Sequence, residues 1–422
     1  MSSSTGQRGK HRVSKFAAVY AALALFFALT AMSTDASAAQ EPPRERTLEE
    51  IKSEALVRAR TGMYPMIGLD PADVNEAFQH IKSKDMDEWA AGFDAVADRY
   101  MAQGKSLESS DPAKANAAYL RAWRLYYFGN WPVPISPGKL RSYNKSLEAF
   151  VAHGRLLDPP LQVVRIPFED KEIVGYLRMP KDAKGPVPMV IAINGADSRK
   201  ENMSLSFDAA IPHGIGYIAV DTPGTGQAPI KASPTADRLY SRVIDWLIAR
   251  PDVDKSRIAV EGQSWGAYWA TKLAMVERAR LKCVIAQSPG VHAGYVHGLH
   301  EDEMLRNREY LFGLSQVFQF LYGVKTIEEA NRISPQMSLV NQHLIGKPTT
   351  PMLIIAGAED TLIPMSDIYL ILDNGDIPKD AWINPQGGHL GRQVGVWPDP
   401  VIFSRVIIPW LIRHLDMPAA AQ

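Results

Sequence analysis

The chain has 422 residues, of which 46% are hydrophobic and 22% are charged, a composition that excludes general disorder and allows one large globular domain plus a smaller one. Basic and acidic residues both number 46, so the formal net charge is zero and no overall positive field would attract nucleic acid. A single cysteine, Cys283, excludes an intramolecular disulfide, and the apolar run around it predicts a buried thiol.

The first 38 residues have the pattern of a secretory signal peptide. A basic start at 8–15 precedes an uncharged apolar run at 16–32, and small residues follow at 36–38. We therefore predict a cleaved signal peptide at 1–38, export to a bacterial periplasm or secretion, and no stable membrane insertion of the mature chain. The alternative is an uncleaved anchor, because a run of 17 residues is at the short limit for spanning a bilayer.

Residues 39–160 are predicted to form an N-terminal helical cap domain. Apolar residues recur there at intervals of three and four, which is the period of an amphipathic helix. Helix N-caps are expected at three residues that each precede a proline: Asp70, Asp111 and Ser136. No fixed motif recurs, so the helices are not expected to form a repeat array.

The pattern changes after residue 160. Residues 161–180 predict two antiparallel strands joined at an Asp-Lys turn. Six short apolar runs then alternate with helical patterns, which is typical of a parallel sheet covered by helices: 187–195, 216–221, 257–264, 281–289, 350–360 and 380–388. The interval at about 292–347 breaks the alternation with helical, aromatic-rich segments, so we expect a helical lid there. The fold class is therefore α/β.

A glycine-rich motif lies at the junction of a strand pattern and a helix pattern. Residues 262–266 read GQSWG and match G-x-S-x-G, the nucleophile elbow, in which a sharp turn exposes the serine. Gly262 and Gly266 are expected to make room for Ser264. The helix that follows would direct free backbone N–H groups at negative charge developing beside the serine oxygen.

A serine hydroxyl needs a base to remove its proton and an acid to orient that base. Asp360 follows one strand pattern, and His389 stands in a glycine-flanked loop after the last one. The chain order Ser264, Asp360, His389 is that of the α/β-hydrolase triad, so residues 161–418 are predicted to form an α/β-hydrolase catalytic domain. Glu359 is the competing acid, but Asp360 is favoured because its side chain is shorter and it ends the run.

The loop after the first parallel strand is predicted to complete an oxyanion hole. Gly195 would bring the backbone close to the site, and the N–H of Ala196 would join that of Trp265. Asn194 occupies the position at which many lipases have histidine.

Two further patterns were considered as cofactor sites, and neither predicts one. The histidines and acids at 292–303 lack the second histidine of the zinc-protease motif, so no metal is predicted. The glycines at 221–227 have no lysine after them, so this segment is not a phosphate-binding loop and is expected at the rim of the site. We predict that no cofactor is used.

The chain resembles the FrsA-like α/β-hydrolases with an N-terminal helical domain, which include 2,6-dihydroxypseudooxynicotine hydrolase and fungal polyketide-shortening hydrolases. The resemblance covers roughly Ala122 to Leu415. It is carried by the elbow and by YYFGNWPVP, SYNKSLEAFVAHGRLLDPP, NGADSRKEN, DTPGTGQ and AGAEDTLIP. The chain departs from the family pattern GGLDSTKEE at Asn194 and Ala196, and from SLGGY at Trp265 and Ala267.

This resemblance implies hydrolysis of esters or cleavage of carbon–carbon bonds next to a ketone, with the helical domain closing over the site. Several members are dimers, so a homodimer is one expectation. We predict a serine hydrolase that cleaves a small-molecule carboxylic ester through an acyl-enzyme. The alternatives are a carbon–carbon hydrolase acting on an acyl-phenol or diketone, a prolyl-oligopeptidase-type peptidase, and a binding module on a decayed hydrolase fold.

Overall fold

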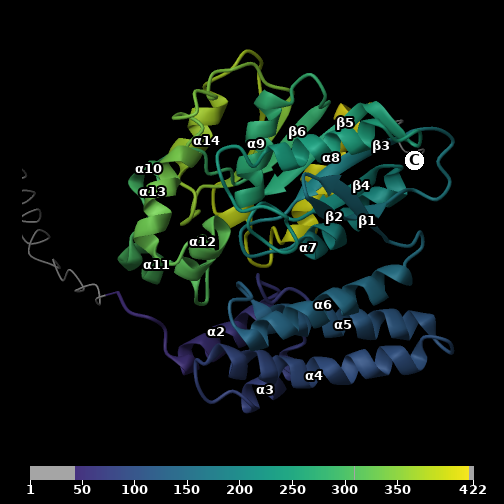
Figure 1. The fold of residues 1–422 in the computed structure, drawn as a ribbon, viewed down its shortest axis with the longest axis vertical. Coiled ribbons are helices and arrows are strands. Elements are labelled where there is room, and N and C mark those ends of the chain that lie inside the picture. The colour runs from purple at the N-terminus through teal and green to yellow at the C-terminus, as the bar shows by residue number, and fades with distance from the viewer. Residues whose placement is uncertain (1–42, 308, 418–422) are drawn as a thin grey trace, which may run out of the picture. The chain divides into compact units, whose positions relative to one another are not determined.

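The computed structural model describes residues 43–307 and 309–417 (Figure 1). The predicted signal peptide at 1–38 lies outside these residues, so export stays a prediction. Within the described ranges, none of the helices combines the length and the apolar character needed to span a bilayer.

The N-terminal part of the described chain is entirely helical. It comprises α2 (Leu48–Thr61), α3 (Pro71–Gln79), α4 (Met86–Leu107), α5 (Pro112–Asn130) and α6 (Pro137–Arg155). The three predicted N-caps are confirmed, because each of these side chains accepts a hydrogen bond from a backbone N–H of the helix it precedes: Asp70, Asp111 and Ser136. Helices α4, α5 and α6 run side by side, and aromatic pairs such as Phe93 and Phe128 pack edge to face between them (Figure 1).

In the described residues, a single sheet of eight strands follows, in the order β1-β2-β4-β3-β5-β6-β7-β8. The strands are β1 (Gln162–Phe168), β2 (Lys171–Arg178), β3 (Val187–Ile193), β4 (Gly216–Val220), β5 (Val253–Gln263), β6 (Cys283–Gln287), β7 (Met352–Gly357) and β8 (Asp380–Asn384). Strand β2 pairs antiparallel with β1 and β4, and all other pairs are parallel. The predicted strands and the α/β class are confirmed.

The turn between β1 and β2 differs from the prediction. Phe168 pairs directly with Lys171, so the two-residue loop is Glu169–Asp170 and Lys171 already belongs to the strand. Glu169 adopts a φ of 51° in this loop. The expected Asp-Lys turn was therefore wrong by one residue, because the pairing of the two strands determines the loop position.

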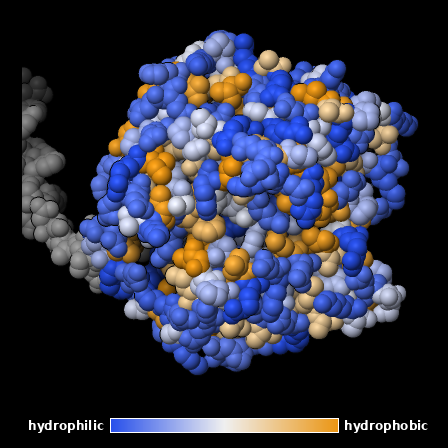
Figure 2. Space-filling view, viewed as in Figure 1, coloured by the Kyte–Doolittle hydropathy of each residue, from blue (hydrophilic) through white to orange (hydrophobic). Residues whose placement is uncertain are grey.

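Helices pack against the sheet, in which β3, β4, β6 and β7 are buried along their length. The helices after β3 are α7 (Lys200–Phe207), α8 (Arg238–Ile248), α9 (Trp265–Val276), α14 (Met365–Leu372), α15 (Asp399–Ile402) and α16 (Ile408–His414). Four more lie between β6 and β7, in the interval of the predicted lid: α10 (Ala293–His297), α11 (Glu301–Arg306), α12 (Leu314–Tyr322) and α13 (Ile327–Met337). The face shown in Figure 2 is mainly hydrophilic with scattered apolar groups, as expected when most apolar side chains are in the core.

Candidate active site

Ser264 lies in the sharp turn between β5 and α9. Its φ of 54° and ψ of −114° are outside the usual regions for a residue with a side chain. A Cβ added to Gly262 would lie 2.2 Å from the carbonyl oxygen of Gly266, and one added to Gly266 would lie 2.4 Å from that of Ile193. Only glycine fits at these two positions, so the turn itself requires the motif.

The structure brings Ser264, Asp360 and His389 into one hydrogen-bonded chain. His389 Nε2 lies 2.9 Å from Ser264 Oγ, and His389 Nδ1 lies 2.8 Å from Asp360 Oδ2. The side chains of His389 and Asp360 are only 8% and 2% exposed, so water competes little for these bonds. With Nδ1–H donating to the carboxylate, Nε2 is left to accept the serine proton.

Asp360 is held as a carboxylate. Its Oδ1 accepts hydrogen bonds from the amides of Leu362 and Ile363 at 2.8 and 3.0 Å. Burial alone would raise the pKa of Asp360, but the charge of His389 and these hydrogen bonds outweigh it and lower the pKa below its ordinary value. Glu359, the competing acid, is exposed, and among the described residues its side chain makes no hydrogen bond or ion pair with His389.

The loop that carries His389 is fixed by the end of β6. Leu390 donates its amide to Ser288 Oγ at 2.9 Å and accepts a hydrogen bond from Gln287 Nε2 at 2.8 Å. A Cβ on Gly357 would lie 2.1 Å from the carbonyl oxygen of Gly388, so the loop also packs directly on β7. Gln287 and Ser288 were not predicted as site residues, although two polar residues ending an apolar strand pattern were a signal for them.

Ala196 and Trp265 line the same cavity as Ser264. Among the described residues, neither of their backbone amides has a hydrogen-bond acceptor, so both are available to an oxyanion. Gly195 lies beside them: its amide donates to Ser198 Oγ at 2.9 Å, and a Cβ on it would be 3.5 Å from the Cβ of Ser264. That is an ordinary contact, so space alone does not require glycine at 195.

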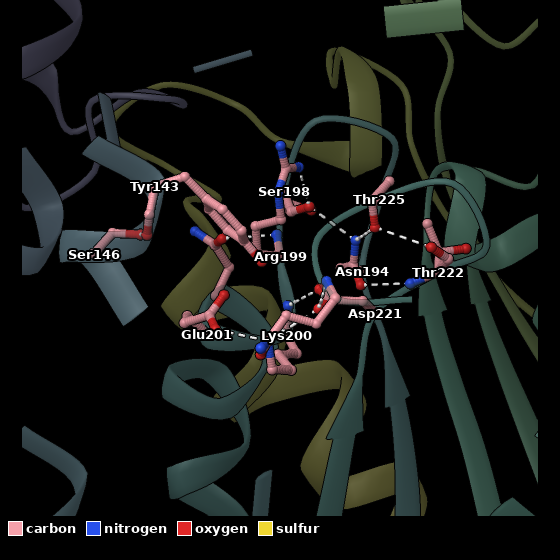
Figure 3. A network of polar contacts seen from close by, with 12 residues as sticks. Tyr143, Ser146, Asn194, Ser198, Arg199, Lys200, Glu201, Asp221, Thr222 and Thr225 are labelled. Carbon is pink, nitrogen blue, oxygen red and sulfur yellow. Dashed lines mark hydrogen bonds and ion pairs between the residues drawn. The ribbon is translucent and has the colours of Figure 1, made fainter. Parts of the chain in front are cut away.

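A buried polar network supports this loop from below (Figure 3). Asn194 Nδ2 donates to the carbonyl oxygens of Gly195 and Ser198, both at 2.8 Å, and its Oδ1 accepts the amide of Thr222 at 3.0 Å. The same Nδ2 also donates to Thr225 Oγ1 at 3.1 Å. The Asn194 side chain therefore connects the segment after β4 to the loop after β3 that carries Ala196, here named the oxyanion loop. Its NH₂ group donates hydrogen bonds and its carbonyl oxygen accepts one.

The segment 221–227 was wrongly expected at the rim of the site. Asp221 is 2% exposed, and its carboxylate accepts from Lys200 Nζ and from the amide of Gln227, both at 2.9 Å. Burial alone would lower the pKa of Lys200, but the charges of Asp221 and Glu201 outweigh it and raise that pKa. The segment supports the oxyanion loop instead, because Asp221 forms a buried ion pair with Lys200, which directly follows that loop. A buried ion pair of this kind needs hydrogen bonds to its charged groups in place of water.

The helical part contacts the oxyanion loop directly. Trp131 Nε1 donates to Asp197 Oδ2 at 2.9 Å, and the Tyr127 hydroxyl donates to the Asp197 carbonyl oxygen at 3.0 Å. Arg199 Nη2 donates to the Pro132 carbonyl oxygen at 3.1 Å. The aromatic segment at 126–134 therefore contacts Asp197, the residue next to Ala196, a role that was not predicted for it.

Two cavities meet at Ser264. The first, of about 380 Å³ and here named the histidine-side cavity, is lined by His389, by charged side chains that include Arg124 and Arg392, and by apolar side chains such as Leu205 and Phe403. The second, of about 490 Å³ and named the lid-side cavity, is lined by Ala196 and Trp265 and by mainly apolar residues of the lid interval. Ser264 lines both, so a substrate bound at its oxygen has room on two sides.

Two histidines of the lid interval, His292 and His297, lie within hydrogen-bond distance of neighbouring side chains. His292 Nδ1 lies 2.7 Å from Ser338 Oγ, and His297 Nε2 lies 3.0 Å from Glu303 Oε1. Within the part of the chain that the structure describes, no group of three or more histidine, cysteine, aspartate or glutamate side chains is arranged to hold a metal.

Comparison with known protein families shows to which family the chain belongs. The family model described as Esterase FrsA-like matches residues 74–380. The chain belongs to the FrsA-like family. This FrsA-like protein is 30% identical over 383 residues to the hydrolyase poxO of Penicillium oxalicum, covering 78% of this chain and 90% of poxO. The esterase FrsA of Yersinia pseudotuberculosis serotype O:3 is 27% identical over 277 residues, which are 64% of this chain and 66% of that one.

Other similarities are more limited in sequence or in length. The α/β hydrolase ucsC of Acremonium sp is 29% identical over 257 residues, and the aligned part is 54% of this FrsA-like chain and 52% of ucsC. The solved structure of 2,6-dihydroxy-pseudo-oxynicotine hydrolase superposes with a TM-score of 0.69 at 18% identity, covering 87% of this chain and 95% of that one. AbyA5 gives 0.66 at 16% identity, covering 88% and 96%. These structures confirm the α/β-hydrolase fold, and the family resemblance is confirmed.

Proposed function

We propose that this FrsA-like α/β-hydrolase cleaves a carboxylic ester through an acyl-enzyme formed on Ser264. The hydrogen-bonded chain from Asp360 through His389 to Ser264 is the observation that carries this proposal. The presence of an esterase among the family relatives is consistent with it. All eight strands of the described residues belong to one sheet, so nothing in this part of the chain supports the propeller of a prolyl-oligopeptidase-type peptidase.

The residues have distinct roles in the proposed reaction. Ser264 Oγ attacks the ester carbonyl carbon while His389 Nε2 takes its proton, and Asp360 stabilises the resulting imidazolium. The amides of Ala196 and Trp265 donate to the oxyanion of the tetrahedral intermediate. His389 then returns the proton to the leaving alcohol, and a water molecule activated by the same imidazole releases the acid in the second half of the reaction.

The two cavities suggest how the substrate lies. His389 lines the histidine-side cavity and not the lid-side cavity. Because His389 must protonate the leaving oxygen, the alcohol part belongs in the histidine-side cavity. The acyl part then extends into the lid-side cavity, whose wall includes Tyr295, Leu299 and Phe318.

A panel of 4-nitrophenyl esters and aryl ketones tests the proposed reaction. We expect turnover of short and medium esters, an initial burst of nitrophenol when deacylation is the slower step, and little cleavage of ketones. Cleavage of an acyl-phenol or diketone in preference to every ester would replace ester hydrolysis by carbon–carbon hydrolysis. Absence of both reactions would leave the binding module on a hydrolase fold as the better account.

The pH dependence follows from the environment of His389. Burial alone would lower the pKa of His389, but the Asp360 carboxylate outweighs it, so the pKa lies above the ordinary value of 6.5. The imidazole must be neutral to accept the serine proton, so kcat/KM should fall as the pH drops through this raised pKa. We expect the acid limb of the kcat/KM profile above pH 6.5. A limb below that value would contradict the assignment of His389 as the base.

The contact between Trp131 and Asp197 should affect turnover more than binding. Trp131→Phe removes the donor to Asp197 and loosens the loop that presents the Ala196 amide, so we expect kcat to fall about 3- to 30-fold, less than the loss of a whole oxyanion donor. KM should change little. Steady-state kinetics on one ester, with thermal unfolding of each variant, makes the measurement.

Trp410→Phe is the matched control for this variant. Trp410 is similarly buried and donates its Nε1–H to Asp380 Oδ2 at 2.6 Å. Asp197, the partner of Trp131, lines the histidine-side cavity, whereas Asp380 lines neither cavity at Ser264. It should lower the midpoint of thermal unfolding to a similar extent and leave kcat unchanged. Equal losses of kcat in the two variants would mean that the Trp131 contact has a purely structural role.

A further inference from the structure

One cation in the histidine-side cavity lacks a carboxylate partner. Arg124, on α5, lines this cavity together with Ser264 and His389. Among the described residues, its guanidinium makes one hydrogen bond, from Nη1 to the carbonyl oxygen of Gly68 at 3.2 Å, and no ion pair. A guanidinium carries five N–H groups, so most of its donors stay free for a ligand.

The guanidinium of Arg124 packs against the backbone at Gly68. Gly68 has a φ of 70°, and a Cβ added to it would lie 2.5 Å from Arg124 Cζ. The planar guanidinium therefore lies directly against the Gly68 backbone, a position that a side chain at 68 would block. The burial of Arg124 lowers the pKa of its guanidinium, because no nearby carboxylate offsets the loss of water around the charge.

The other charged groups on this cavity wall have partners. Arg392 Nε donates to Asp399 Oδ1 at 2.6 Å. Asp197 accepts from Trp131, and burial raises the pKa of its carboxyl. Glu309 Oε1 accepts a hydrogen bond from the backbone amide of His389 at 3.4 Å. Of the cavity cations in the described chain, Arg124 is thus the one whose charge no neighbouring carboxylate balances.

Resting on the ester hydrolysis proposed above, we propose that Arg124 binds a carboxylate carried by the leaving alcohol of the substrate. The alcohol occupies the histidine-side cavity because His389 must protonate it. A planar guanidinium pairs with a carboxylate through two parallel hydrogen bonds, and the partial burial of Arg124 reduces competition from water. The substrate class is therefore an ester of a hydroxy acid, with the charged end of the alcohol directed at α5.

Two isosteric esters that differ only in charge test this assignment. The substrates are 4-butyryloxybenzoate and 4-butyryloxybenzamide, assayed with wild type, Arg124→Met, Arg124→Lys and the control Arg60→Met, whose arginine is exposed on α2. Arg124→Met should lower kcat/KM for the benzoate about 10- to 100-fold, the range for a lost hydrogen bond to a charged group, and change it little for the benzamide. Arg124→Lys should be intermediate, and Arg60→Met should behave as wild type.

Binding of the alcohol products gives a measurement that does not depend on turnover. In isothermal titration calorimetry, wild type should bind 4-hydroxybenzoate more tightly than 4-hydroxybenzamide, and Arg124→Met should abolish the difference. Equal affinities in wild type, or equal losses for both compounds in Arg124→Met, would overturn the Arg124 assignment even where esters are hydrolysed. Arg124-dependent binding of 4-hydroxybenzoate without hydrolysis of either ester would instead reject ester hydrolysis and keep the anion site.

Discussion

Ser264→Ala is expected to lower kcat on a nitrophenyl ester by about 10⁴- to 10⁶-fold, the scale on which removing a triad nucleophile acts. Without the hydroxyl no acyl-enzyme forms, and water must attack the bound ester unassisted by covalent chemistry. The hydroxyl lies 2.9 Å from His389 Nε2, so its removal eliminates the attacking oxygen while the Asp360–His389 pair stays in place. Single-turnover kinetics with the purified variant gives the measurement.

Two controls keep this result interpretable. Alanine at 264 keeps the same backbone atoms at the strained turn, so circular dichroism and the thermal midpoint should match wild type closely. Ser110→Ala, at an exposed position between α4 and α5, should retain full activity. Activity of Ser264→Ala close to that of wild type would show that another group attacks the substrate.

Asp360→Asn should lower kcat by about 10⁴-fold, because an asparagine amide favours the wrong tautomer of the base. The carboxylate accepts the proton of His389 Nδ1 at 2.8 Å, which leaves Nε2 unprotonated toward Ser264. The asparagine NH₂ group can donate to Nδ1 instead, and the proton then moves to Nε2, which can no longer act as a base. Loss of the carboxylate also removes the charge that raises the pKa of His389, so any residual activity should have its acid limb at lower pH.

Glu359→Gln is the matched control for the acid, since it removes the neighbouring carboxylate in the same way. Glu359 is exposed, so this variant should retain wild-type kcat. A large loss in Glu359→Gln together with an active Asp360→Asn would reverse the assignment of the orienting acid.

The features that could be predicted from the sequence depend on local pattern. The strand and helix periods around 262–266 predicted the turn, and the polar residues after two later strands predicted Asp360 and His389. Parallel strands place their carboxyl ends at one edge of the sheet, so residues far apart in the chain were expected to converge there. The structure brings these three side chains together, His389 and Ser264 being 125 positions apart.

The features that were missed depend on packing between distant segments. Trp131 and Asp197 are 66 positions apart, and neither lies in a pattern that indicates the other. Asn194 bonds to Thr222 and Thr225 because the segment after β4 lies beside the oxyanion loop, and Asp221 of the same segment is buried and not at the rim. The type and spacing of residues in the sequence do not indicate such contacts, because they depend on the pairing order of the strands.

The homodimer expectation stays a prediction.

Labelling with a fluorophosphonate probe tests most directly whether Ser264 is an activated nucleophile. The probe forms a stable bond to a serine whose proton is removed by a neighbouring base, and peptide mass spectrometry locates the modified residue. The account predicts rapid, stoichiometric modification of Ser264 in wild type, strongly slowed modification in His389→Ala, and none in Ser264→Ala. An unlabelled Ser264 in folded wild-type protein, or equal labelling with and without His389, would contradict it.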